Sequence, residues 1–263
     1  MLPNELLIVD TMNVVRRVYE ANPAPESAEK VEHALRSLNG TLRNIEQQYP
    51  VTHRAMVMDA PGKNWRHDVY PDYKAGRTPM PQILRDGVNE YLRVLKGRGW
   101  PKWEYVGFEA DDGIFSLAAA AEKVGLPTLT ISTDKDVSAV LQFKGARVRD
   151  HFGDIWRDEA WCLAKFGVLP RQLQDLLALT GDPSDGIPGV DKVGVKTAAK
   201  WLQAYDTLEG VLAAAPNMTG AIGQRLRDQT DRARLSRQLT EMRRDLIPAN
   251  FDWDRLKIKT PTV

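Results

Sequence analysis

The chain has 263 residues, and its 36 lysines and arginines almost balance its 35 aspartates and glutamates. A formal net charge of +1 excludes a globally basic nucleic-acid-binding protein, so any nucleic-acid surface must come from local segregation of charge. One cysteine excludes an intramolecular disulfide, and four histidines argue against a zinc site of the usual spacings. No apolar run approaches the roughly 18 residues of a membrane span, and the apolar start lacks the features of a signal peptide, so we expect a cytoplasmic protein without membrane contact.

Strand-like and helix-like segments alternate through the first half of the chain, which predicts an α/β fold with a mostly parallel sheet and flanking helices. Residues from 158 onward read as almost entirely helical. We therefore expect an α/β core at 1–157 and a helical region at 158–263. The expected elements are strands at 6–9, 55–58, 103–106 and 129–131, helices at 26–48, 82–96 and 109–124, a polar stretch at 60–81, and a hairpin near 153–156.

Four of the expected strands lead into carboxylates. Ligands of parallel α/β sheets bind outside the carboxyl ends of the strands, so these side chains are expected at one rim. Helix capping is the simpler explanation for the acids at 109–112, because Asp and Glu are favoured in first helical turns. Taken together, however, so many acids would repel one another unless a cation such as Mg²⁺ or Mn²⁺ compensated them. The seven acids are Asp10, Asp59, Glu109, Asp111, Asp112, Asp134 and Asp136.

A second acidic pair, Asp182 and Asp185, directly precedes two glycines that are separated by a short turn, Gly189 and Gly194. An alanine-rich helix start follows, and this pattern indicates a helix-hairpin-helix at about 181–203. Its backbone N–H groups could meet a DNA phosphate and its carbonyls could hold a monovalent cation. An ordinary turn between two packed helices is the alternative.

The polar stretch at 60–81 carries basic and aromatic residues together, and it begins beside Asp59. Such residues can clamp phosphates and stack the bases of a single strand, although a solvated loop has a similar composition. Arg16 and Arg17 lie one or two helical turns past Asp10 and are candidates for the same rim. The basic series at 225–237 is either a solvated helix face or a duplex contact. The residues of the stretch are Lys63, Trp65, Arg66, His67, Tyr70, Tyr73, Lys74 and Arg77.

Five short motifs occur in order along the chain: LIVD at 7–10, YKAGR at 73–77, EADD at 109–112, TDKD at 133–136, and GDPSD at 181–185 with IPG at 187–189. Together they resemble the 5′ nuclease (flap endonuclease) family, from about residue 6 to 250. This family includes the N-terminal domain of bacterial DNA polymerase I, phage 5′ nucleases and stand-alone nucleases of the exonuclease IX type. The resemblance implies a PIN-like α/β core, a helical arch at about 70–95, and a C-terminal helix-3-turn-helix.

The resemblance also implies a function: structure-specific hydrolysis of DNA phosphodiesters near single-strand/duplex junctions, as a flap endonuclease and 5′-3′ exonuclease in DNA replication and repair. Two Mg²⁺ or Mn²⁺ ions would take part, with K⁺ at the helix-hairpin-helix and a monomer acting on DNA with a 5′ flap or 5′ single-stranded end. The implied ligands are Asp10, Asp59, Glu109, Asp111 and Asp134 for the first metal, and Asp112, Asp136, Asp182 and Asp185 for the second. The implied catalytic residues are Lys74, Arg77, Arg17 and Tyr73, and the implied DNA contacts are Arg66, Gly189, Val190, Val193, Gly194, Lys196 and Thr197.

Two other functions would fit part of this pattern. A PIN-type ribonuclease would share the α/β core and the first metal site, but the helix-hairpin-helix and the pair Asp182 and Asp185 favour the DNA enzyme. A non-catalytic protein that binds branched DNA would keep the basic stretch and the hairpin without needing all nine acids.

Overall fold

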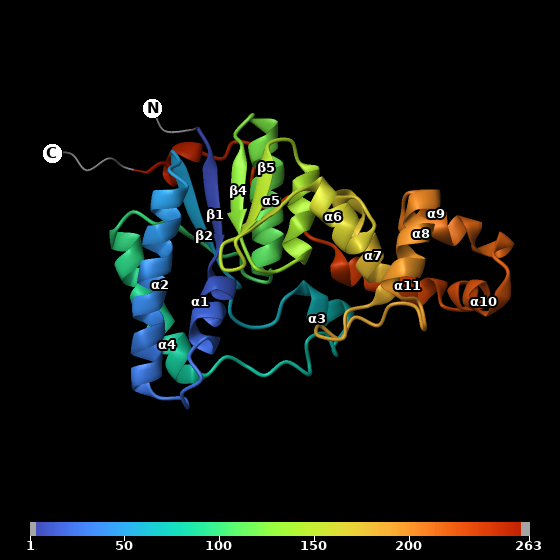
Figure 1. Cartoon of the computed structure of the whole chain (residues 1–263), viewed down its shortest axis with the longest axis horizontal. Coiled ribbons are helices and arrows are strands. Elements are labelled where there is room, and N and C mark those ends of the chain that lie inside the picture. Colours follow the sequence, from blue (N-terminus) through green and yellow to red (C-terminus); the bar gives the residue numbers. More distant parts are fainter. Residues whose placement is uncertain (1–3, 259–263) are drawn as a thin grey trace.

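The computed structural model of the chain describes residues 4–258. Its centre is a six-stranded sheet in the order β3-β2-β1-β4-β5-β6 (Figure 1). The first five strands of the chain run parallel, and β6 runs antiparallel beside β5 at one edge. This confirms the expected α/β fold with a mostly parallel sheet. The strands are β1 (Leu6–Asp10), β2 (His53–Val57), β3 (Lys102–Trp103), β4 (Thr128–Ile131), β5 (Ala146–Asp150) and β6 (Ile155–Arg157).

The central strand β1 lies between β2 and β4, and all five of its residues are buried. Ile8 pairs in register with Ala55 on one side and with Thr130 on the other. A strand that is covered on both faces appears in sequence as a continuous apolar run, which explains why this strand was predictable. β3 is shorter than the predicted strand at 103–106, because the chain turns there and the Phe108 N–H donates to the Tyr105 carbonyl at 2.9 Å.

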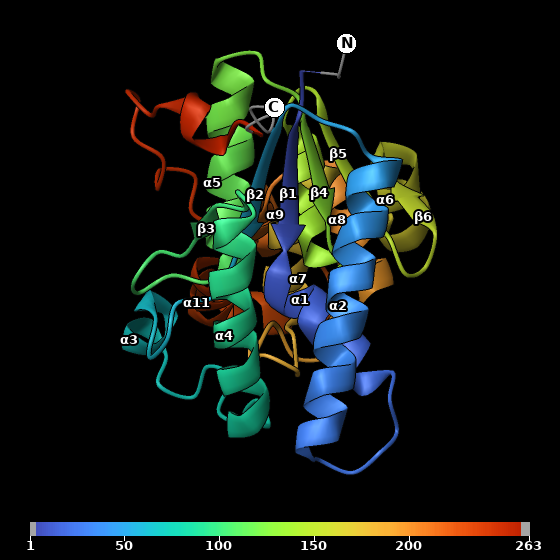
Figure 2. The ribbon, with the colours of Figure 1, turned by 90° about the vertical axis from the view of Figure 1, so that its left-hand side faces the viewer.

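One face of the sheet is covered by α1 (Thr11–Glu20), α2 (Ala28–Gln48) and α4 (Gln82–Gly97), and Figure 2 looks onto this side. Ser27 caps the start of α2, where its hydroxyl accepts a hydrogen bond from the Lys30 N–H at 3.2 Å. The helix predicted at 82–96 is α4, and the arch predicted at about 70–95 stays a prediction. Helix α4 packs in the same apolar layer as α2, because its apolar stripe must be buried. That stripe consists of Leu84, Val88, Leu92 and Leu95.

The opposite face is covered by α5 (Ala110–Lys123) and the 3-10 helix η1 (Asp136–Gln142), and one apolar cluster continues from there into the C-terminal helices. The division at residue 157 stays a prediction, since β6 ends at Arg157 while this cluster includes residues on both sides of it. The remaining helices are α6 (Glu159–Phe166), η2 (Pro170–Gln172), α7 (Leu173–Thr180), α8 (Val195–Tyr205), α9 (Leu208–Ala214), η3 (Ala215–Asn217), α10 (Gly220–Asp228), α11 (Thr230–Thr240) and η4 (Trp253–Leu256).

Residues 60–81, here called the bridging segment, leave the sheet after β2, run across to the helical region and return to α4 (Figure 1). The segment contains the short helix α3 (Trp65–Val69). Tyr73 packs in a small apolar cluster with Ile187 and Leu239, and the Lys74 N–H donates to the Asp185 carbonyl at 2.8 Å. Gly186 has a φ of +72°, and a Cβ there would lie 3.0 Å from the Asp72 carbonyl oxygen, so glycine permits this close approach. None of the helices between residues 4 and 258 has the length and apolar character to cross a membrane.

Candidate active site

Eight of the nine predicted carboxylates line one cleft of about 460 Å³ at the carboxyl ends of the strands. Four basic residues also line the cleft: Arg16, Lys74, Arg77 and Lys135. The structure thus brings together side chains that lie as far as 175 residues apart in the sequence, from Asp10 to Asp185. The eight carboxylates belong to Asp10, Asp59, Glu109, Asp111, Asp134, Asp136, Asp182 and Asp185.

The acids nearest the sheet are placed by strand ends and helix starts. Asp10 ends β1 and caps α1, where its carboxylate accepts from the Asn13 N–H at 3.3 Å and from the Ser132 hydroxyl at 2.8 Å. Asp59 follows β2, and its carboxylate accepts from the Ala110 N–H at 2.8 Å. Asp111 lies in the first turn of α5. Asp10 therefore both caps a helix and lines the cleft.

The other wall of the cleft is formed by two loops. Asp134 follows β4, and its carboxylate accepts from the Asp136 N–H at 2.9 Å, at the start of η1. Asp182 and Asp185 lie in the turn after α7, which is closed by paired backbone hydrogen bonds of 2.9 Å between Asp182 and Ile187. The Ser184 N–H and hydroxyl donate to the Asp182 carboxylate at 2.8 and 2.7 Å. These short local bonds fix the turn so that it presents its acids to the sheet.

The crowded carboxylates perturb one another's protonation. The pKa of Asp10 is raised to about 7, mainly by burial and in part by the neighbouring Asp134 and Asp59, while the Ser132 hydrogen bond acts in the opposite direction. Burial likewise raises the pKa of Asp136 to about 7, with Asp134 and Asp182 adding to the effect. The pKa of Asp111 is also well above its ordinary range, because it is buried beside Asp134 and Asp10. A bound divalent cation would favour the ionised forms of all three.

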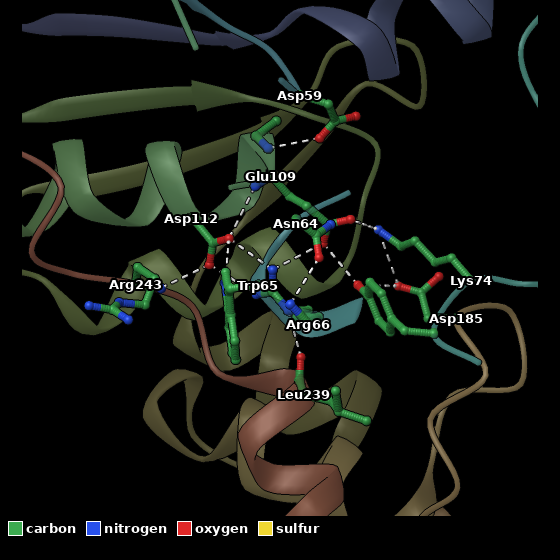
Figure 3. A network of polar contacts seen from close by, with 12 residues as sticks. Asp59, Asn64, Trp65, Arg66, Lys74, Glu109, Asp112, Asp185, Leu239 and Arg243 are labelled. Atoms are coloured by element: carbon green, nitrogen blue, oxygen red, sulfur yellow. Dashed lines mark hydrogen bonds and ion pairs between the residues drawn. The ribbon is translucent and has the colours of Figure 1, made fainter. Parts of the chain in front are cut away.

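Glu109 lies where the basic and acidic walls meet (Figure 3). Its carboxylate accepts from the Tyr73 hydroxyl at 2.8 Å and forms an ion pair with the Lys74 ammonium. Burial alone would raise the pKa of Glu109, but Lys74 and Arg66 outweigh it and lower the pKa. Lys74 also lies 3.6 Å from the Asp185 carboxylate, which forms a second ion pair with Arg77. Burial and Glu109 raise the pKa of Tyr73 well above its usual range, so the phenol stays protonated and donates.

Three predicted site residues lie elsewhere, and these predictions are corrected. Asp112 is fully buried behind the cleft, where its carboxylate pairs with Arg66. Arg66 is only 3% exposed, so it cannot contact DNA. Arg17 is exposed on α1 but does not line the cleft, whereas its neighbour Arg16 does. Helical periodicity alone did not distinguish the two arginines.

The predicted DNA-binding turn separates into buried and exposed parts. Gly189 donates its N–H to the Ser236 hydroxyl at 3.0 Å, and Val190 donates to the Leu179 carbonyl at 2.8 Å, so neither N–H can bind a phosphate. The side chains of Val190 and Val193 are buried. By contrast, α8 begins after Gly194 without a side-chain cap, and Lys196 and Thr197 lie in its first turn, with Lys196 exposed. An uncapped helix start with free N–H groups is a ready anion site.

The donor set of the cleft fits a hard divalent cation, because its lining offers many carboxylate oxygens and neither thiolate nor imidazole. Within residues 4–258, no three His, Cys, Asp or Glu side chains already converge as a ready-made metal cage. The ion pairs of Lys74 and Arg77 occupy two of the acids in this arrangement. Metal binding would therefore require these side chains to rearrange.

Comparisons with known proteins agree with this geometry. The 5′-3′ exonuclease family matches with its N-terminal resolvase-like domain over residues 5–167 and with its C-terminal SAM fold over residues 168–263. The chain is 36% identical to "Flap endonuclease Xni" of Photorhabdus laumondii over 258 residues, covering 97% of this chain and 99% of that protein. It is 35% identical to the protein of the same name from Shewanella oneidensis, covering 98% and 97% of the two chains.

Solved structures share the fold. The phage T5 D15 protein, co-crystallised with metal ions, has a TM-score of 0.74 at 19% identity, covering 90% of this chain and 89% of that chain. The catalytic core of Rad2 in complex with DNA substrate has a TM-score of 0.57 at 14% identity, covering 96% and 83%. The chain therefore belongs to the 5′-3′ exonuclease family, as its motifs predicted, and it is a divalent-metal-dependent 5′ nuclease.

Proposed function

We propose that the chain is a structure-specific flap endonuclease that hydrolyses DNA phosphodiesters near single-strand/duplex junctions with the help of two Mg²⁺ or Mn²⁺ ions. The observation that supports this most strongly is the cleft itself, where eight carboxylates face Lys74, Arg77 and Arg16. A cleft with so many carboxylates would repel an anionic phosphodiester unless bound cations compensated the negative charge.

The carboxylates fall into two groups that would each hold a metal. Asp10, Asp59 and Asp111 lie around the ends of β1 and β2, and Asp134 faces them. Glu109 adjoins this first group. The second group consists of Asp136, Asp182 and Asp185, which lie close enough for the latter two to raise the pKa of Asp136. When bound, the cations would lower the pKa of the attacking water and neutralise charge on the scissile phosphate.

The basic residues would hold the phosphate during this reaction. Lys74 and Arg77 already reach into the cleft, where they pair with Glu109 and Asp185. Once metals take over those carboxylates, both side chains are free to contact a phosphate oxygen and to stabilise the charge that develops on it. Tyr73 keeps its proton and orients Glu109 by its 2.8 Å hydrogen bond. Arg16, which also lines the cleft, would make a further contact with the strand.

A path for the 5′ strand continues beside the bridging segment. A second cavity of about 410 Å³ shares Arg16, Asp59, Lys74, Arg77 and Glu109 with the cleft. Apolar side chains and further basic groups line it together, a combination that suits the bases and phosphates of a single strand. They include Met58, Pro61, Met80, Val88, Arg85 and Lys102. The predicted arch, at about 70–95, would comprise the end of the bridging segment together with most of α4.

The duplex next to the flap would be held at the uncapped start of α8, where Lys196 supplies a positive charge. Contacts of this kind read the backbone and not the bases, so cleavage should follow junction shape. We also propose that the carbonyls of the turn before α8 bind K⁺, which exchange of KCl for NaCl in a duplex-binding assay would test. The monomeric state and the cytoplasmic location stay predictions.

The test is a 5′-labelled flap duplex incubated with the protein in Mg²⁺, with EDTA and a 3′-flap duplex as controls. We expect cleavage near the base of the 5′ flap only with Mg²⁺, and loss of cleavage in the Asp185→Asn variant. Preferential cutting of an RNA flap would support a PIN-type ribonuclease instead. Flap binding in EDTA without cutting after Mg²⁺ addition would indicate a non-catalytic DNA-binding protein.

A further inference from the structure

Arg66 is the most completely bonded side chain beside the cleft. It lies in the first turn of α3, where Asn64 caps the helix. Its guanidinium donates to both oxygens of Asp112 at 2.8 and 2.9 Å, and to the Glu109 carboxylate at 3.1 Å. The remaining donors reach the backbone carbonyls of Leu239 at 2.8 Å and Glu241 at 2.6 Å. All five N–H groups of the guanidinium are therefore engaged within the protein.

Asp112 is equally saturated (Figure 3). Besides the two bonds from Arg66, its carboxylate accepts from the backbone N–H groups of Glu109 at 3.2 Å and Arg243 at 3.0 Å. The indole N–H of Trp65 adds a contact of 3.4 Å. A carboxylate has about four lone-pair sites, and these donors fill them. Asp112 therefore has no oxygen to offer to a metal, although it is adjacent in sequence to Asp111, which lines the cleft.

We propose that Arg66 and Asp112 are positioning residues that fasten the bridging segment across the metal cleft, and that Asp112 is not a metal ligand. The proposal rests on the proposed function and deepens it. Arg66 also touches Glu109, which in turn orients Tyr73 and Lys74. The buried pair thus sets the place of one carboxylate, Glu109, and of two side chains of the bridging segment, the buried Tyr73 and the cleft-lining Lys74.

The same pair connects the cleft to the duplex-binding turn through α11. The two carbonyls that Arg66 contacts, of Leu239 and Glu241, lie at the C-terminal end of this helix. Along the same helix, the Ser236 hydroxyl accepts from the Gly189 N–H at 3.0 Å, and Arg232 donates to the Pro188 carbonyl at 3.1 Å. The single helix α11 therefore contacts both the buried pair of Arg66 and Asp112 and the turn before α8. The pair should fix the distance between the bound duplex and the cleft, and with it the position of the cut.

The test compares Asp112→Asn with Asp182→Asn, a variant of a proposed metal ligand that lines the cleft. For Asp112→Asn we expect unchanged half-saturation by Mg²⁺ in flap cleavage, a fall in kcat of about tenfold to a hundredfold, and cuts spread over neighbouring phosphates. Small misplacements of reacting groups produce losses of this size. Asp182→Asn should instead raise the Mg²⁺ concentration needed for half-maximal cleavage and leave the cut position unchanged.

Hydrogen exchange of the metal-free protein provides a readout that does not depend on activity. Peptides from residues 64–77 should exchange faster in Asp112→Asn and at the wild-type rate in Asp182→Asn. If Asp112→Asn does not fold, Arg66→Lys keeps the charge but loses the fork of donors, and it should show the same faster exchange. Unchanged exchange at 64–77, or a raised Mg²⁺ requirement in Asp112→Asn, would overturn the proposal. Absence of flap cleavage by the wild-type protein would contradict the proposed function alone, because the exchange measurement stands without it.

Discussion

The acidic cleft should make the stability of the metal-free protein fall as the pH rises. Asp10 is 5% exposed, and its pKa is raised from 3.8 to about 7. Because the folded state binds this proton more tightly than the unfolded state, the contribution of Asp10 to the free energy of unfolding is highest below about pH 4. It decreases as the pH rises toward 7. The difference between 3.8 and about 7, at about 1.4 kcal/mol per pKa unit, amounts to about 4 kcal/mol for complete ionisation.

Between pH 5 and pH 8 the Asp10 contribution should fall by about 3 kcal/mol, a large part of the stability of an ordinary domain. Asp10→Asn cannot ionise, so its free energy of unfolding relative to wild type should increase by about this amount over the same pH range. Urea denaturation in EDTA at pH 5 and pH 8 measures both proteins. Glu32→Gln, which removes an exposed carboxylate on α2, serves as the control.

Mg²⁺ supplies the second arm of this experiment. A cation bound among the carboxylates favours their ionised forms, so saturating Mg²⁺ should stabilise wild type more at pH 8 than at pH 5. The difference between the stabilisation by Mg²⁺ at pH 8 and at pH 5 should be smaller in Asp10→Asn. Parallel pH dependence of wild type and Asp10→Asn in EDTA would refute the reasoning, because it would mean that Asp10 is not buried against other charges.

The basic residues give three further predictions. Lys74→Ala should lower kcat for flap cleavage about a hundredfold, because it removes a charge that stabilises the reacting phosphate. The affinity of this variant for the flap in EDTA, measured by anisotropy, should stay within a fewfold of the wild-type affinity. Calorimetry without DNA should show that the same variant binds Mn²⁺ more tightly, because Lys74 no longer competes for Glu109 and Asp185; weaker binding would contradict this. Arg16→Gln should reduce kcat/KM at least tenfold and Arg17→Gln less than threefold, because Arg16 lines the cleft and Arg17 does not. Equal losses for the two variants in a single-turnover assay would argue against the placement of Arg16 in the cleft. Lys196→Ala should weaken duplex binding and make the plot of log affinity against log salt concentration shallower, by about 1 in slope. An unchanged slope in a KCl titration would exclude a phosphate contact by Lys196.

The sequence predicted those parts of the fold that depend on local periodicity. The strand at 6–9 and the helix at 26–48 are examples, because a fully buried strand and an amphipathic helix each leave a pattern over neighbouring residues. The rim of acids was predictable for a related reason, since parallel strands deliver their carboxyl ends to one edge. The structure agrees with both expectations at Asp10 and Asp111.

The positions of individual charged side chains in the fold were not predictable in the same way. Asp111 and Asp112 are adjacent, yet one lines the cleft and the other pairs with Arg66, which lies 46 residues away in the chain. Successive helical residues point about 100° apart, so adjacent acids face different neighbours, and those neighbours depend on the tertiary fold. The burial of Arg66 and Tyr73 in the bridging segment was unpredictable for the same reason, because composition does not distinguish a solvated loop from a segment whose side chains are buried.

The ion pairs of the cleft suggest how metal and DNA binding are linked. In the metal-free arrangement, Lys74 and Arg77 neutralise Glu109 and Asp185, so two cationic groups needed for the phosphate are held by two carboxylates needed for the metals. A divalent cation that binds those carboxylates releases the basic side chains, and a phosphate that binds the basic side chains releases the carboxylates. Each ligand therefore removes a competitor of the other, and by thermodynamic linkage the two must bind with positive cooperativity. The cleft can thus remain intact without metal through internal ion pairs, and it assembles its catalytic groups only when both ligands are present.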